Sequence, residues 1–210
     1  MSDASGSHTD EANTVRTKCW DGALHAYGTS FMFQRRARIL GQRLNVLTYI
    51  GFLVPVIIGG LVLAYGHFKS LPTVIAIASA FALAQTVVSL WSVVGGWVAG
   101  YSYSATSAAD NARLAKRYED LAVLPPDDLT LFRHEYEKIL IRDESRQEQD
   151  YQQGVNEAEK RRGLRAAFRQ YERECPGCGK QPISMEPTDC DICGNFDHNP
   201  IRRIRGRLWN

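Results

Sequence analysis

The sequence predicts an all-α membrane protein, with a two-helix transmembrane hairpin, flanking cytosolic helices and a small C-terminal four-cysteine ribbon. Three observations lead to this fold class: the distribution of charge, two long apolar runs, and a pair of CxxC motifs near the C-terminus. The 210 residues are enough for one domain of ordinary size or two small ones.

Charged residues are distributed unevenly along the chain. There are 25 basic and 23 acidic residues and the net charge is +2, yet between Leu44 and Ala109 only Lys69 is charged. A soluble domain spreads charge over its surface, whereas a membrane-embedded block excludes it. The distribution argues against a single large soluble core, and the near-zero net charge gives no general case for nucleic-acid binding.

Two segments precede the first apolar run. Residues 1–13 are polar and partly acidic and lack the basic start and apolar stretch of a secretory signal, so we expect a disordered tail. Residues 14–43 predict a cytosolic N-terminal helix, although two glycines weaken the pattern. Its apolar stripe consists of Trp20, Leu24, Tyr27 and Phe31.

Two apolar runs predict a transmembrane hairpin over residues 44–103. The first run, 44–65, has 22 residues, and a helix of that length reaches roughly 33 Å, enough to cross the hydrocarbon core. Pro55 predicts a kink in its middle. The second span covers residues 71–100, and the short connection at 66–70 requires antiparallel helices. A buried hairpin of a soluble fold is the alternative, but uncharged runs of this length are rare there.

Basic residues predict the orientation of the hairpin. They flank both spans on one side, whereas the short connection carries only Lys69. The positive-inside rule therefore predicts that both termini are cytoplasmic. The flanking residues are Arg35, Arg36, Arg38, Arg43, Arg113, Lys116 and Arg117.

Small residues recur every four positions along the second span, at Ser92, Gly96, Gly100 and Ser104. This spacing lets helix backbones approach closely, either within the hairpin or between subunits of a homo-oligomer. Both interpretations stay open. Gln85, the strongly polar side chain deep in this span, either hydrogen-bonds between helices or lines a polar path.

Residues 104–174 predict further cytosolic helices. Pro125-Pro126 ends the first of them, because proline cannot continue a helix, and Asp127 or Asp128 caps the next. We expect this second helix to run on through the polar stretch to Glu174. The apolar faces consist of Leu114, Tyr118 and Leu121, then Leu129, Phe132, Tyr136 and Ile139.

Two cysteine pairs define residues 175–196. Cys175 and Cys178 form the first pair and Cys190 and Cys193 the second, with eleven residues between the pairs and a glycine after each. Two such turns are typical of a structural four-cysteine Zn²⁺ site, which predicts a zinc ribbon. Two disulfides, a redox pair and an iron–sulfur centre are the alternatives.

The C-terminal segment, residues 197–210, is basic and amphipathic. Its arginines either remain solvated or contact anionic lipid headgroups or a nucleic acid. They are Arg202, Arg203, Arg205 and Arg207. The sequence contains no recognisable nucleophile–base pair, HExxH motif or phosphate-binding glycine loop, so we expect no enzyme.

The cysteine pattern with its eleven-residue gap resembles the mobilome CxxCx(11)CxxC proteins of bacteria, as does the stretch CWDGALHAYGTSFMFQRRAR before the hairpin. The helix–hairpin–helix order, including Tyr118-Glu119-Asp120-Leu121, is similar to the SLATT two-transmembrane effectors. The resemblance implies an inner-membrane effector of mobile elements or anti-phage defence, triggered by a cytosolic sensor encoded nearby.

The resemblance and the residues together support one main hypothesis, that the hairpins oligomerise and permeabilise the inner membrane when triggered from the cytosol. The alternative is a membrane-anchored zinc-ribbon adaptor that binds a protein or nucleic acid and opens no pore. A constitutive channel is a third hypothesis, for which one central polar residue is slender support.

Overall fold

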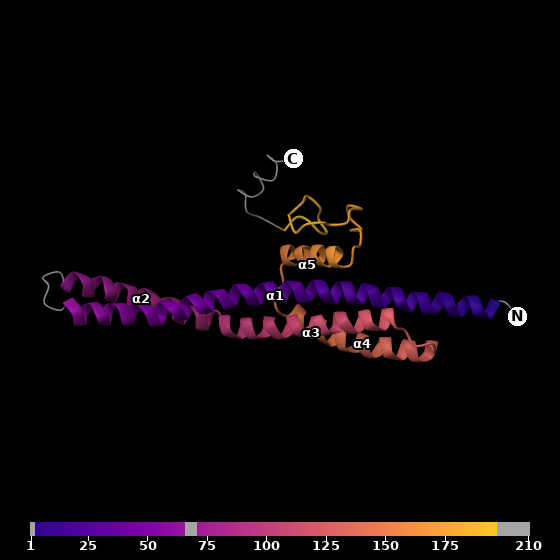
Figure 1. The fold of residues 1–210 in the computed structure, drawn as a ribbon, viewed down its shortest axis with the longest axis horizontal. Helices are drawn as coiled ribbons and strands as arrows, with labels where there is room; N and C mark the ends of the chain where they lie inside the picture. The colour runs from indigo at the N-terminus through magenta and orange to yellow at the C-terminus, as the bar shows by residue number, and fades with distance from the viewer. Residues whose placement is uncertain (1–2, 66–70, 197–210) are drawn as a thin grey trace. The chain divides into compact units, whose positions relative to one another are not determined.

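The computed structural model describes residues 3–65 and 71–196, and within them it is all-helical, with no strand. The five helices are α1 (Asp3–Tyr65), α2 (Leu71–Val94), α3 (Trp97–Val123), α4 (Leu129–Tyr151) and α5 (Glu157–Gln170) (Figure 1). They form two compact units. Unit 1 is Met1–Gln34 with Thr106–Asn210, and unit 2 is Arg35–Ala105, so that α1 and α3 contribute to both.

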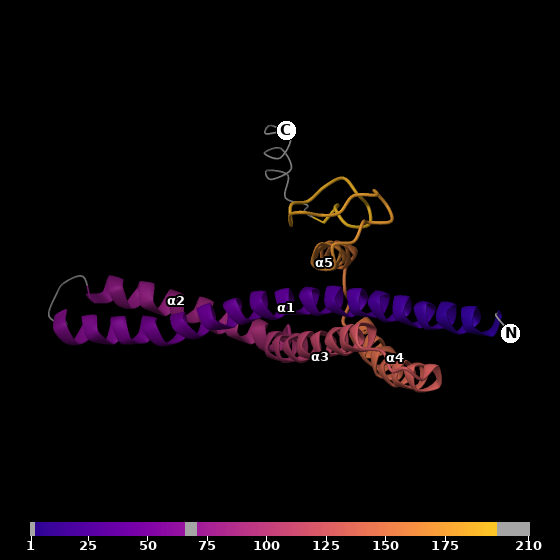
Figure 2. The same cartoon turned by 45° about the vertical axis from the view of Figure 1, so that its right-hand side comes forward.

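Unit 2 is an antiparallel pair of apolar helices. The C-terminal part of α1 lies beside α2 in both views (Figures 1 and 2). Gly51 faces Gln85, and Leu40 contacts Gly100. Both α1 and α2 are long and apolar enough to cross a membrane, and only 0% and 6% of their apolar windows are buried inside the structure. A buried soluble hairpin would show the opposite, so the exposure argues against that alternative.

The predicted single helix over 71–100 is wrong, because α2 ends at Val94 and α3 begins at Trp97. Gly96 has φ +62, the left-handed conformation that commonly ends a helix and that glycine adopts at little cost. The Gly95 N–H donates to the Trp91 carbonyl at 2.7 Å, closing the last turn. The four-residue repeat of small residues therefore spans two helices.

The predicted disordered tail, residues 1–13, is helical over the part that the structure describes, since α1 begins at Asp3. Asp10 and Glu11 are part of this helix, and the Asp10 carbonyl accepts a hydrogen bond from the Thr14 hydroxyl at 2.9 Å. Glu11 also pairs with Arg133 of α4. At its other end α1 continues past residue 43 and through Pro55 without interruption.

Unit 1 has its core between α1, α3 and α4. The buried face of α1 includes Cys19, Ala23 and Ala26, whereas the predicted stripe residues Trp20 and Tyr27 are only partly buried. Small residues occupy this face because the helices pack closely. A Cβ added to Gly22 would lie 2.8 Å from the Tyr118 ring, so glycine at that position makes room for the buried tyrosine.

The predicted long helix through Glu174 is wrong, because α4 ends at Tyr151 and α5 begins at Glu157. Gly154 has φ +57. Asn156 and Glu159 then form a capping box: the Asn156 side chain accepts from the Glu159 N–H at 2.8 Å, and the Glu159 carboxylate accepts from the Asn156 N–H at 3.2 Å. The predicted Asp128 cap of α4 is confirmed, since its carboxylate accepts from the Thr130 N–H.

Candidate metal centre

Helix α5 carries the cysteine module and packs on α1. The two helices meet at glycines, because a Cβ added to Gly163 would lie 2.6 Å from the Gly28 carbonyl oxygen. This close approach brings Leu24 of α1 and Ala167 and Phe168 of α5 into one core with the cysteines. The module therefore shares its hydrophobic core with two helices.

The four cysteines converge on one point. Their Sγ atoms lie within 4.8 Å of one another, and the pairs Cys175–Cys190 and Cys178–Cys193 are each separated by 3.9 Å. A tetrahedral zinc site with bonds of about 2.3 Å has sulfur–sulfur edges of about 3.8 Å. All four cysteines are free, which contradicts the disulfide alternative.

Each CxxC pair sits on the same backbone turn. The Gly179 N–H donates to the Cys175 carbonyl and the Gly194 N–H donates to the Cys190 carbonyl, both at 2.8 Å. Gly179 adopts φ +63, which glycine permits at little cost, and a Cβ at Gly194 would overlap with Thr188. The glycines after the two pairs are thus part of the geometry that directs both thiols of a pair inwards.

The surroundings shift the thiol pKa values of the second cysteine pair in opposite directions. The backbone amide of Cys193 lowers the pKa of the Cys190 thiol to about 7, whereas burial raises the pKa of Cys193. Four thiols this close repel one another when ionised, so a cation among them is needed for all to deprotonate. Four protein ligands leave no open position, and a bound metal would be structural. The donor set fits zinc.

Arginines of α5 hold the module in place. Arg165, only 6% exposed, donates to the Ser184 carbonyl at 2.8 Å, and its Nη1 lies 3.9 Å from the Cys193 sulfur. Arg161 donates to the Asn195 carbonyl at 3.1 Å, and Arg162 lies 4.7 Å from the Phe196 ring centroid. Sequence reasoning missed these residues, although the arginine-rich helix directly before Cys175 was a usable signal.

The predicted packing residues of the second span lie inside unit 2. Ser92 and Ser104 are buried, and a Cβ on Gly100 would contact Leu40 at 3.4 Å. Gly96 forms the helix break and has open space beside it. Gln85 is half-buried, with its amide nitrogen 2.8 Å from a Cβ built on Gly51. It therefore faces the neighbouring helix. The predicted contacts of Arg202, Arg203, Arg205 and Arg207 lie outside the described residues.

Two buried carboxylates join α3 to α4, and the sequence analysis missed both. Asp150 accepts hydrogen bonds from Ser107 at 2.7 Å and Asn111 at 2.8 Å. Asp143 accepts from the Tyr118 hydroxyl at 3.1 Å. The two aspartates are seven residues apart and thus lie on one face of α4, a spacing that could have indicated their common role.

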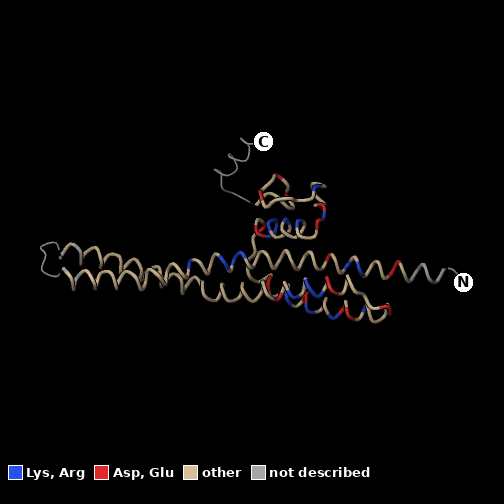
Figure 3. Tube along the Cα trace, viewed as in Figure 1, with Lys and Arg blue, Asp and Glu red and all other residues tan. Residues whose placement is uncertain are grey.

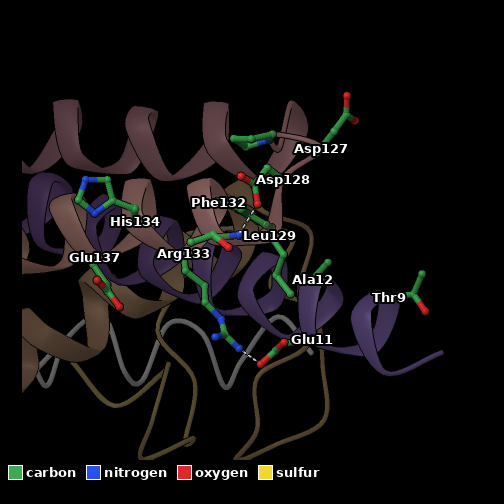
Figure 4. Close-up of a pocket in the computed structure, with 12 residues that line it drawn as sticks. Thr9, Glu11, Ala12, Asp127, Asp128, Leu129, Phe132, Arg133, His134 and Glu137 are labelled. Atoms are coloured by element: carbon green, nitrogen blue, oxygen red, sulfur yellow. Dashed lines mark hydrogen bonds and ion pairs between the residues drawn. The ribbon is translucent and has the colours of Figure 1, made fainter. Parts of the chain in front are cut away.

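A hollow of about 800 Å³ lies at the other end of unit 1. Its lining comes from the start of α1, the loop before α4 and the first turns of α4, and the Glu11–Arg133 ion pair crosses it (Figure 4). Charges of both signs line it, including those of Asp127, Asp128 and Arg133. Over residues 3–65 and 71–196, the cysteine cluster is the one group of three or more side chains placed to share a metal.

The cysteine geometry agrees with the comparison with known families. The profile of the mobilome CxxCx(11)CxxC proteins matches residues 16–196. The chain belongs to this family. The match covers α1 from residue 16 onwards, the apolar pair and both CxxC turns. No curated protein and no solved structure matches the chain.

Proposed function

We propose that this mobilome CxxCx(11)CxxC protein is a membrane effector of a mobile-element or anti-phage defence system. In this proposal it inserts its apolar pair into the bacterial inner membrane with both termini cytoplasmic. It then oligomerises when triggered by a cytosolic partner, and permeabilises the membrane without acting as an enzyme. The likeness to SLATT effectors is one ground for the proposal.

The observation that carries the proposal is the exposed apolar surface of unit 2. Large apolar side chains face outwards along both helices, with Leu63 90% exposed and Val93 76% exposed. In water such a continuous apolar surface would need a partner protein to cover it. In a membrane the lipid covers it directly. Helical geometry pairs the backbone groups of α1 and α2 internally, as the hydrocarbon core requires, except that Pro55 of α1 has no N–H to donate.

A second stripe of small residues supports oligomerisation. Ala76, Ala80 and Ala84 recur every four residues on α2, and all three are exposed. Small residues at this spacing allow close packing between helices in lipid. Because Ser92 is buried within unit 2, the alanine stripe replaces it as the proposed contact between subunits.

The metal centre supports a trigger from the cytosolic side. Its core includes Leu24, a residue of the same helix that continues to Tyr65. We propose that zinc holds the module together and that a sensor protein recognises it. Gln85, which faces α1, then acts as an interhelical contact in the resting pair.

Ion or dye leakage tests this proposal. Induced wild-type protein should depolarise cells under phage challenge or forced expression, and Ala80→Leu with Ala84→Leu should reduce both cross-linked oligomers and leakage. The matched control is Ala82→Leu, which is exposed on nearly the opposite side of α2. Wild-type protein that leaks no more than the double variant under any condition would show the pore proposal to be wrong.

The second candidate is a membrane-anchored zinc-ribbon adaptor. It is favoured by the size of unit 1, which contains α4, α5 and the cysteine module outside the apolar pair. An adaptor should capture its partner without changing the membrane potential. The leakage experiment therefore separates the two functions, because an adaptor gives recruitment with an intact membrane barrier.

A further inference from the structure

The arginines before the first apolar run have no acidic neighbours in sequence. From Gly22 to Ala109 the chain contains no aspartate or glutamate, while Arg35, Arg36, Arg38 and Arg43 fall within nine residues. Along α1 the positions one turn from Arg38 are Gln34, Arg35, Gly41 and Gln42, none of which is acidic. Figure 3 shows these basic residues just before the uncharged part of α1.

The structure places aromatic side chains beside this arginine group. The Arg43 guanidinium lies 5.8 Å from the centre of the Trp97 ring, and a Cβ on Gly41 would lie 3.1 Å from the Tyr101 ring. Arg35, Arg38 and Arg43 are exposed. Tryptophan and tyrosine prefer the boundary between hydrocarbon and headgroups, so the two rings put Arg43 at headgroup level.

We propose that Arg35, Arg38 and Arg43, with Trp97 and Tyr101, form a binding belt for anionic phospholipid headgroups. The inference rests on the proposed membrane insertion of unit 2 and names the lipid that unit 2 selects. Guanidinium groups bind phosphate through two parallel hydrogen bonds. A headgroup with net negative charge supplies the counter-charge that this stretch of the chain lacks.

The spacing of the arginines along α1 fits a layer of phospholipid headgroups. Arg35 and Arg43 are separated by roughly 12 Å at 1.5 Å per residue. Long arginine side chains extend toward the headgroups from positions on either side of them. Arg43 and Arg38 thus reach the phosphates, whereas Arg35 lies slightly beyond the Debye length of about 8–10 Å, so that anionic lipids attract it more weakly.

The test uses the full-length chain reconstituted into vesicles of mixed phosphatidylglycerol and phosphatidylcholine. Brominating one lipid or the other quenches nearby tryptophan fluorescence, and the ratio of the two quenching curves gives the lipid preference. Wild-type protein should prefer phosphatidylglycerol, and the preference should fall with added salt. Arg38→Gln with Arg43→Gln should reduce it by about fivefold for each arginine removed.

The matched control makes the same two charge changes elsewhere. Arg142→Gln with Arg169→Gln alters exposed arginines of α4 and α5, leaves all tryptophans in place, and should keep the wild-type preference. Resistance to alkaline extraction is measured on every sample. Two outcomes contradict the binding belt but leave the membrane insertion standing. One is inserted wild-type protein with equal affinity for both lipids, and the other is an equal loss of lipid preference in both double variants. Wild-type protein that alkali extracts overturns the proposed membrane insertion and the belt with it.

Discussion

At the scale of single residues, glycines decide where helices touch and where they end. Gly28 and Gly163 permit α1 and α5 to meet backbone to backbone, whereas Gly96 and Gly154 supply positive φ angles. From sequence, all four look like residues that weaken a helix. A glycine at a helix contact differs from a glycine at a helix end only in its neighbour on another helix. The local sequence pattern carries no signal of that neighbour.

The first prediction concerns Gly163. An added methyl group would lie 2.6 Å from the Gly28 carbonyl oxygen, so Gly163→Ala should separate α5 from α1 and cost about 1–3 kcal/mol of stability in unit 1. Thermal unfolding with limited proteolysis around residues 152–156 measures this. Gly59→Ala, at a helical glycine with nothing within 4 Å, should leave both readouts unchanged. A Gly163→Ala protein as resistant as wild type would contradict the close crossing.

The second prediction concerns the ligand set. Cys178→Ser should remove the metal from purified protein, because three thiolates and a hydroxyl bind zinc poorly. Cys19→Ala should keep it: Cys19 is buried in the core between α1, α3 and α4, and burial raises its pKa to about 11. Elemental analysis should give one zinc per chain for wild type and Cys19→Ala. Iron in place of zinc, or no metal, would contradict the prediction.

At the scale of elements, helix ends with strong local chemistry could be predicted from sequence. Pro125-Pro126 and the Asp128 cap separate α3 from α4 as expected. The breaks at Gly96 and before Asn156 were missed, although adjacent glycines and an Asn-x-x-Glu pattern were present. The apolar run continues across the break at Gly96, and the polar run continues across the break before Asn156. The composition alone therefore predicted one helix in each place, although the capping residues indicated two.

The third prediction concerns α5 as the support of the cysteine module. Arg165→Met keeps the aliphatic stem but leaves the partly buried Ser184 carbonyl without its donor, which costs about 1–3 kcal/mol. It also removes the cation beside Cys193. Zinc should therefore transfer to a chelator about tenfold faster or more, as expected for a loss of this size. Arg169→Met, exposed on the same helix, is the control, and equal rates in both variants would contradict the role of Arg165.

At the scale of the whole molecule, composition and motif spacing predicted the main features better than the periodicity of apolar residues did. Exclusion of charge from residues 44–68 and 70–109 marked the apolar pair, and the cysteine spacing marked the metal centre. The buried face of α1 was predicted poorly, because Cys19 and Ala23 are small and their burial depends on Tyr118 and Phe132 from later helices. The carboxylates Asp143 and Asp150 were missed for the same reason: their hydrogen-bond partners lie on another helix.

The last prediction concerns topology. Basic residues concentrate at Arg35–Arg43 and Arg113–Arg117, whereas the 66–70 connection has one lysine, so reporters fused at the C-terminus should be cytoplasmic and reporters in the connection periplasmic. Changing Arg35, Arg36, Arg38 and Arg43 to Gln, with lysines added in the connection, should increase the inverted fraction. A reducing cytoplasm also keeps the four free thiols available to a metal, whereas the periplasm would oxidise them. A periplasmic C-terminus would contradict the predicted orientation. If that C-terminus still held one zinc on four thiolates, the proposed link between topology and metal binding would also be wrong.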